Sequence, residues 1–116
     1  MPLPGEQHQG NFIVIDPATS KNTRDELVIQ YWEIYDDVPV LIEFFSGKKT
    51  SIETVHYTLE LAIKRQCTLI AVEAVAYQFE LCTLFRYIAD QWNLQGIIVQ
   101  DIYGGKAAKN LSLIHI

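Results

Sequence analysis

The sequence predicts an α/β domain with the element order β-β-β-α-β-α-β, in which helices flank a mixed five-stranded sheet. Two apolar runs carry this prediction, at residues 12–16 (Phe-Ile-Val-Ile-Asp) and 68–73 (Thr-Leu-Ile-Ala-Val-Glu). Near-continuous Val/Ile/Leu runs of this length are typical of strands buried on both faces. The chain has 116 residues, 49% of them hydrophobic, which is the size of one domain with enough apolar side chains for a core.

The first half of the chain predicts a loop followed by three strands. Residues 1–10 contain two prolines and two glycines without periodicity, so we expect a loop or the remnant of a linker there. After the first strand, residues 17–25 form a polar loop. Residues 26–35 and 40–45 are rich in β-branched and aromatic side chains, and the Asp-Asp-Val-Pro segment at 36–39 reads as a hairpin connection. The first three strands are therefore predicted to be antiparallel.

A Thr-x-x-Glu capping box at residues 50–53 predicts the start of a helix, because its side chains satisfy free backbone amides. This helix is expected to end near Gln66. Within this helix, apolar residues recur at helical spacing, at Ile52, Val55, Leu59, Ala62 and Ile63. The helix is predicted to be a crossover, so that residues 69–73 form a fourth strand parallel to the first, with a right-handed connection.

A second helix is predicted directly after the fourth strand. Its apolar stripe consists of Val75, Phe79, Cys82, Phe85, Ile88, Ala89 and Trp92. Gly96 suits its C-terminal cap, because glycine adopts the left-handed conformation that such caps require. Residues 97–102 are then a fifth strand.

The composition excludes several classes of protein. A net charge of −5 and a pI near 5.0 argue against a protein that binds DNA by bulk electrostatics, although a metal nuclease needs no such charge. Cys67 and Cys82 are too few for a disulfide framework or a zinc cluster, and we expect both to be buried thiols in a reducing compartment. Without a long apolar stretch or a signal peptide, the chain is expected to be soluble and intracellular.

Two acids, Asp16 and Glu73, stand where the first and fourth strands end. Ligands of open α/β sheets bind outside the carboxyl ends of the strands. Either acid alone is best interpreted as a solvated residue or a helix cap. Two acids on neighbouring strands, however, favour a site for a divalent cation, which offsets the cost of placing carboxylates where buried strands emerge.

Residues 15–18 (Ile-Asp-Pro-Ala) and 72–78 (Val-Glu-Ala-Val-Ala-Tyr-Gln) resemble the nuclease domain of the large terminase subunit of tailed bacteriophages. The resemblance covers residues 11–110 and implies a ribonuclease H-like fold. It implies a metal-dependent endonuclease that cuts concatemeric viral DNA during genome packaging, in the cytoplasm of an infected bacterium. The implied partners are double-stranded DNA, the portal protein and the small terminase subunit.

The resemblance also assigns roles to residues. Two Mg²⁺ or Mn²⁺ ions are implied, with Asp16 as the ligand that both metals share and Glu73 as a ligand to one of them. Gln78 belongs to the active-site face of the resembled motif, although an exposed helical glutamine is an equally good interpretation. Asp25 precedes the second strand, where we expect it to support or cap the site rather than to bind metal.

Lys106 and Lys109 follow a glycine pair, and the resemblance implies that such a loop contacts DNA; solvated surface lysines are the simpler interpretation. The family's third catalytic acid lies on a helix after the fifth strand, and no residue of this chain can be assigned to it. We expect the nuclease domain to be incomplete at its C-terminus. Residues 111–116 are expected to be a non-native tail, because the hexapeptide resembles a translated sequencing adapter.

Two other classes of function stay open. Another ribonuclease H-like nuclease, of the Holliday-junction resolvase or transposase type, would share the two acids but act on a different DNA substrate. A non-catalytic ribonuclease H-like interaction module would carry the two acids without a chemical role.

Overall fold

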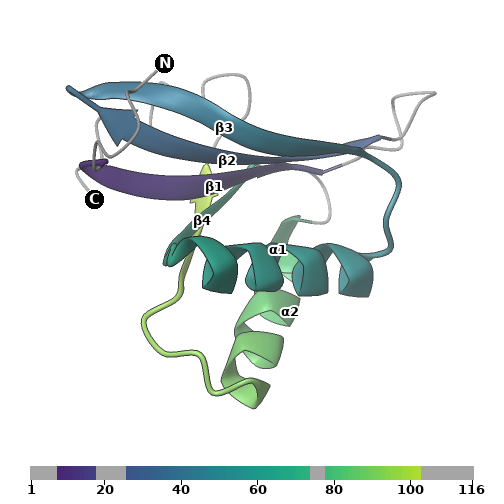
Figure 1. Cartoon of the computed structure of the whole chain (residues 1–116). Helices are drawn as coiled ribbons and strands as arrows, with labels where there is room; N and C mark the ends of the chain where they lie inside the picture. Colours follow the sequence, from purple (N-terminus) through teal and green to yellow (C-terminus); the bar gives the residue numbers. More distant parts are fainter. Residues whose placement is uncertain (1–7, 18–25, 74–77, 103–116) are drawn as a thin grey trace.

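The computed structural model describes residues 8–17, 26–73 and 78–102, with the side chains of residues 78, 79, 101 and 102 excepted. The predicted order of elements is confirmed (Figure 1). The elements are β1 (Gly10–Asp16), β2 (Leu27–Tyr35), β3 (Val38–Gly47), α1 (Ser51–Arg65), β4 (Leu69–Glu73), α2 (Gln78–Gln91) and β5 (Ile98–Ile102).

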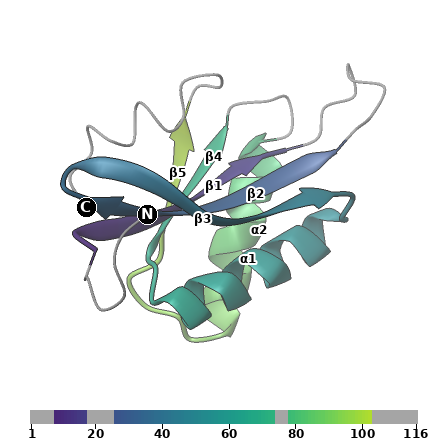
Figure 2. The same cartoon turned by 45° about the horizontal axis from the view of Figure 1, so that its top comes forward.

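The five strands form one mixed sheet in the order β3-β2-β1-β4-β5. β2 pairs antiparallel with both β1 and β3, whereas β4 pairs parallel with both β1 and β5. This confirms the predicted antiparallel first three strands and the parallel fourth strand. Both helices lie on the same side of the sheet (Figures 1 and 2).

The hairpin between β2 and β3 is shorter than predicted. Only Asp36 and Asp37 form the turn, and both have a left-handed backbone, with φ of 51° and 63°. A two-residue hairpin turn of type I′ requires positive φ at both central residues, which aspartate tolerates better than most residues. Val38 and Pro39, which the sequence placed in the connection, belong to β3 instead.

The predicted capping box of α1 is present. The Thr50 side chain accepts a hydrogen bond from the Glu53 amide, and the Glu53 carboxylate accepts one from the Thr50 amide. The predicted apolar stripe is wrong at its two ends, because Ile52 and Ile63 are 55% and 53% exposed. The buried face of α1 consists of Thr54, Val55, Thr58, Leu59, Leu61 and Ala62.

Both helices end in the same way, without glycine. After α1, Gln66 takes a left-handed conformation (φ 52°) and the Cys67 amide donates to the Ala62 carbonyl at 2.8 Å. After α2, Asn93 takes this conformation (φ 60°) and the Leu94 amide donates to the carbonyl of Ala89 at 2.9 Å. These are Schellman-type caps. The prediction of Gly96 as the cap of α2 is therefore wrong, since Asn93 ends the helix three residues earlier.

The buried stripe of α2 is confirmed at Cys82, Phe85, Ile88 and Ala89, but the prediction is wrong at Trp92. Trp92 follows the end of the helix and is exposed; Val75 and the side chain of Phe79 lie outside the described part of the chain. Within the described residues, neither helix has the length and apolar character needed to cross a membrane.

The main core lies between the sheet and the two helices, and its largest side chains with no exposed surface are Tyr31, Phe85, Ile13, Ile15, Ile29, Leu59 and Ile70. Cys67 and Cys82 are buried in it as free thiols, as predicted. A smaller cluster, made of Phe12, Val14, Leu69 and Ala71, lies on the opposite face of the sheet with Trp32 and Ile34 packed against it.

A network of polar side chains on β1 and β2 is centred on the fully buried Tyr31. Its hydroxyl donates to Glu33 Oε2 at 2.7 Å and accepts from Asn11 Nδ2 at 3.1 Å, while the Tyr35 hydroxyl donates to Glu33 Oε1 at 2.7 Å. Burial, and next the hydrogen bond to Glu33, raise the pKa of Tyr31. Burial works against ionisation of Glu33, but the hydrogen bonds from Tyr35 and Tyr31 outweigh it and lower the pKa of Glu33.

We expect Tyr31→Phe to lower the free energy of unfolding by about 1–3 kcal/mol, because the change removes a hydrogen bond from both Glu33 and Asn11 inside the protein. Urea unfolding measures the effect. Tyr57→Phe, at a half-buried tyrosine on α1, is the control and should cost about 0.5 kcal/mol or less. Equal losses for the two variants would contradict the role of the network.

An ion pair fastens α1 to β3. Arg65 donates to Glu43 Oε1 from Nε at 2.9 Å and from a terminal nitrogen, and Lys64 Nζ lies 3.4 Å from the same oxygen. The hydrogen bonds from Arg65 lower the pKa of Glu43, against a smaller opposing effect of burial. A carboxyl group whose pKa is lowered in the folded state stabilises the protein above its unfolded pKa, and this stabilisation is lost as the pH falls through the folded pKa.

Glu43→Gln should therefore lower the free energy of unfolding by about 1 kcal/mol at neutral pH. The difference from the unmodified chain should shrink steadily as the pH falls below the ordinary range of a glutamate pKa. Denaturant unfolding over a series of pH values tests this, with the exposed Glu60→Gln as the control. A difference that is the same at acidic and neutral pH would show that Glu43 acts through packing and not through its charge.

Candidate active site at the carboxyl ends of β1 and β4

The strand register brings Asp16 and Glu73 together. β1 and β4 pair in parallel with Ile13 opposite Ile70 and Ile15 opposite Val72. Asp16 and Glu73 are the next residues of the two strands and are the last residue of each. The two carboxylates therefore lie on neighbouring strands, at the carboxyl ends of both, as predicted.

The acids extend the face of the sheet that is opposite the two helices. Successive residues of a strand point to alternate faces, so Asp16 shares a face with Val14, and Glu73 shares it with Ala71. Val14 and Ala71 belong to the small core cluster on that face. Asp16 is exposed and Glu73 is half-buried. The two acids thus lie at the solvent-exposed end of the small apolar cluster.

The donor chemistry of the pair fits a hard divalent cation such as Mg²⁺ or Mn²⁺, which prefers carboxylate oxygens. Ionised carboxylates that approach each other repel, and a cation held between them relieves the repulsion. Among the described residues, no group of three or more His, Cys, Asp or Glu side chains is placed to hold a metal ion. Asp16 and Glu73 are the two predicted metal ligands among the described residues.

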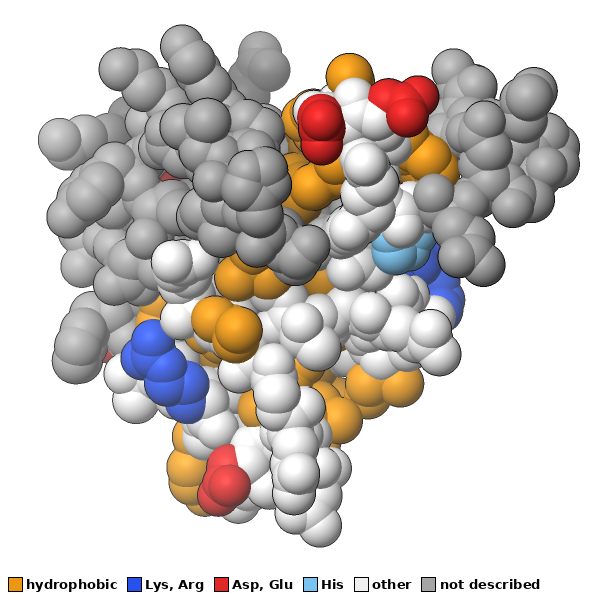
Figure 3. Space-filling model, turned by 90° about the vertical axis from the view of Figure 1, so that its left-hand side faces the viewer, with side chains coloured by type: hydrophobic (Ala, Val, Ile, Leu, Met, Phe, Trp, Pro, Cys, Tyr) orange, Lys and Arg blue, Asp and Glu red, His pale blue; other side chains and the backbone are white. Residues whose placement is uncertain are grey.

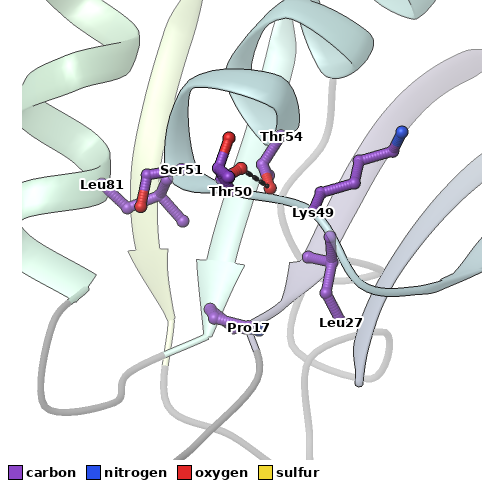
Figure 4. Close-up of a pocket in the computed structure, with 7 residues that line it drawn as sticks. All are labelled: Pro17, Leu27, Lys49, Thr50, Ser51, Thr54 and Leu81. Atoms are coloured by element: carbon purple, nitrogen blue, oxygen red, sulfur yellow. Dashed lines mark hydrogen bonds between the residues drawn. The ribbon is translucent and has the colours of Figure 1, made fainter. Parts of the chain in front are cut away.

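A pocket of about 220 Å³, which the sequence did not indicate, lies on the face of the sheet that the helices cover, near the carboxyl end of β1 (Figure 4). Pro17, directly after Asp16, lines it together with Leu27, Leu81 and the start of α1. The Thr54 hydroxyl in its wall donates to the Thr50 carbonyl at 2.8 Å. Because neither Asp16 nor Glu73 lines this pocket, it is not the carboxylate site.

The other predicted site residues are not brought into the described site. Gln78 is the first residue of α2, but the position of its side chain is not described. Asp25, Lys106 and Lys109 lie outside the described residues. Their assigned roles stay predictions.

Positive charge is sparse on the described part of one face of the molecule. On the face of the molecule shown in Figure 3, the described basic side chains lie apart from one another, between hydrophobic and uncharged ones. This agrees with the net charge of −5. A broad basic surface for nucleic acid is therefore not seen on the described part of that face.

No protein-family model matches the sequence, and no curated protein matches it. Solved structures do match. One is the large terminase of the thermophilic bacteriophage D6E, with a TM-score of 0.57 and 14% identity over 99% of this chain and 27% of the terminase chain. The chain thus spans about a quarter of that terminase.

A second match is RuvC of T. thermophilus, solved in complex with a Holliday junction substrate. Its TM-score is 0.57 at 15% identity, and the match covers 90% of this chain and 71% of RuvC. At such identities the likeness concerns the fold. The mixed sheet with β1 and β4 as parallel neighbours and two helices on one side is a ribonuclease H-like fold, as the sequence predicted.

Proposed function

We propose that this chain is the nuclease domain of a metal-dependent DNA endonuclease, extending over residues 11–110. The observation that carries the proposal is the placement of Asp16 and Glu73, side by side at the carboxyl ends of adjacent parallel strands. Two ribonuclease H-like proteins of similar fold, a phage terminase and RuvC, support it.

Asp16 and Glu73 would each hold a divalent cation through carboxylate oxygens, with Asp16 as the ligand shared by two ions and Glu73 as a ligand to one. Bound Mg²⁺ or Mn²⁺ supplies the activation of water and the charge stabilisation that phosphodiester hydrolysis needs. The strands themselves supply the positioning. Because backbone pairing fixes the ends of β1 and β4, the two carboxylates need little reorganisation to bind a cation.

The biological role that we favour is cutting of concatemeric viral DNA during genome packaging, by a phage large terminase. Its partners would then be double-stranded DNA, the portal protein and the small terminase subunit, in the cytoplasm of an infected bacterium. The likeness of residues 15–18 and 72–78 to the terminase nuclease and the match to the D6E terminase support this role.

A junction-resolving nuclease is the second candidate. The match to RuvC covers 71% of the RuvC chain, whereas the match to the terminase covers 27% of that protein. If the chain acts on branched DNA, it should prefer a four-way junction to a linear duplex.

The test is cleavage of supercoiled plasmid, linear duplex and a four-way junction by the 116-residue chain with Mg²⁺, with Mn²⁺ and with a chelator. In parallel, titration with Mn²⁺ followed by electron paramagnetic resonance measures metal binding without activity. Metal-dependent cleavage of duplex supports the terminase role, and strong preference for the junction supports the resolvase role. A folded chain that neither binds Mn²⁺ nor cuts any of the three substrates would favour a non-catalytic interaction module.

A further inference from the structure

We propose that β3 is an interface through which two copies of this chain pair antiparallel, edge to edge. β3 is the first strand in the sheet order, so among the described residues only β2 pairs with it. Figures 1 and 2 show it along one margin of the sheet. An edge strand presents a row of unpaired N–H and C=O groups, which another strand can satisfy.

The side chains of β3 do not protect this edge. Natural edge strands are commonly blocked by lysine, by proline, by β-bulges or by short length, and of these devices β3 has one bulge, at Ile42. β3 has ten residues, its proline is its second residue, and it contains no lysine. Three of its apolar side chains are exposed, namely Val38 (57%), Leu41 (39%) and Phe44 (61%). β3 therefore combines free backbone groups with exposed apolar surface.

The charges at the two ends of β3 favour a second copy of β3 as the partner, in the antiparallel orientation. Asp36 and Asp37 precede the strand, and Lys48 and Lys49 follow it. Asp36, Asp37 and Lys48 are exposed. If a second copy pairs antiparallel, its lysine pair lies beside the aspartate pair of the first copy, at both ends of the seam. A parallel pairing would place like charges together, which is unfavourable.

The pairing that joins these charges also matches the exposed apolar side chains. Placing Asp37 opposite Lys48 of the second copy puts Leu41 opposite Phe44 of that copy, and Phe44 opposite its Leu41. Leu41 and Phe44 share a face of the sheet, because they pair with Trp32 and Gln30, two residues apart on β2. Cross-strand apolar pairs of this kind stabilise a sheet.

A β-bulge makes this match possible. Trp32 pairs with Leu41 and Tyr31 pairs with Glu43, so Ile42 is an extra residue in β3. Without it, Leu41 and Phe44, three residues apart, would point to opposite faces. In this register the Glu43 residues of the two copies face each other, and in each copy Arg65 and Lys64 neutralise the carboxylate. The seam thus contains no uncompensated like-charge pair.

Sedimentation velocity over a series of protein concentrations tests the proposal. The full chain should show a monomer–dimer equilibrium. We test two charge variants, Asp36→Lys/Asp37→Lys and Lys48→Glu/Lys49→Glu. The dimer dissociation constant of each should be at least about tenfold higher than that of the unmodified chain. An equimolar mixture of the two should recover dimerisation, because every end of the seam then joins opposite charges. The control is Glu60→Lys/Asp90→Lys, at exposed positions of α1 and α2. It changes the net charge as much as Asp36→Lys/Asp37→Lys does and should dimerise like the unmodified chain.

A monomer at all concentrations would overturn the proposal, and so would a mixture that dimerises no better than its components. Circular dichroism checks that each variant folds. Should the charge variants fail to fold, the register can be tested by disulfide trapping of Leu41→Cys mixed with Phe44→Cys, since Cys67 and Cys82 are buried. The mixture should cross-link more than either variant alone. Preferential cross-linking of either variant with itself would exclude the proposed register.

Discussion

Replacing Asp16 with asparagine should reduce metal-dependent DNA cleavage by about three orders of magnitude. The change keeps the size and the hydrogen-bonding capacity of the side chain but removes the charge that would attract a cation. Metal-ion catalysis is worth several kcal/mol, and about 1.4 kcal/mol corresponds to a tenfold change in rate. Plasmid nicking under conditions where the unmodified chain is active measures the loss, and Mn²⁺ titration should show weaker binding at the same time.

Glu73→Gln should have the same effect in kind, since Glu73 is the neighbouring carboxylate in the register of β1 and β4. Asp90→Asn is the matched control, because Asp90 is an exposed acid on α2. Undiminished cleavage or undiminished Mn²⁺ binding in a folded Asp16→Asn variant would refute the assignment of the site. Loss of cleavage in Asp90→Asn as well would indicate a general effect of charge.

Phe85→Ala should lower the free energy of unfolding by about 3–5 kcal/mol, the loss usual for a large aromatic side chain removed from a core. Phe85 has no exposed surface and packs α2 into the main core. A domain of this size has a total stability of about 5–15 kcal/mol, so the variant should be close to unfolding at physiological temperature. Thermal and urea unfolding, followed by circular dichroism, measure the change.

Tyr87→Ala on the same helix is the control for Phe85→Ala. Tyr87 is 59% exposed, and its hydroxyl accepts a hydrogen bond from Gln91 at 2.9 Å on the surface. Its removal should cost about 1 kcal/mol or less. If the two substitutions destabilise the chain equally, α2 is not held to the sheet mainly through Phe85.

The strands and the start of α1 were predictable because their signals are local. The apolar runs that end at Asp16 and Glu73 belong to strands whose cores are buried, and the capping box at residues 50–53 forms as its residue types require. The crossover connection allows β4 to lie parallel to β1, and the ribonuclease H-like arrangement that the element order matches places the two strands side by side. The relative position of the two acids could therefore be predicted without knowing any side-chain contact.

The errors arose where tertiary packing or backbone geometry decides. Periodicity counts every apolar residue, so it included Ile52 and Ile63, whereas packing buries Thr54 and Thr58 on the other face of α1. Glycine was the expected helix cap, but a left-handed backbone needs only a residue that tolerates positive φ, and Asn93 meets that need first. A sequence alone does not reveal which of several tolerant residues takes such a conformation.

For the candidate site, the two strand-end acids follow from the fold, whereas the supporting residues do not. Gln78, Asp25, Lys106 and Lys109 were assigned through resemblance, and their side chains are not among those that the structure describes. The pocket beside Pro17 had no sequence signal, because its walls come from the residue after β1, from β2, from both helices and from the residues before α1, and include common residue types.

The connectivity of the sheet also sets when the carboxylate pair comes into existence. The β2–β3 hairpin is local and can close as soon as its residues leave the ribosome, while Asp16 and Glu73 are 57 positions apart in the chain. Non-local pairing of this kind is slow, since a long loop must close before any contact is gained. A nascent chain that has made only β1 to β3 carries half of the acid pair. The cation binding that we propose should therefore arise late in biosynthesis, together with the docking of β4.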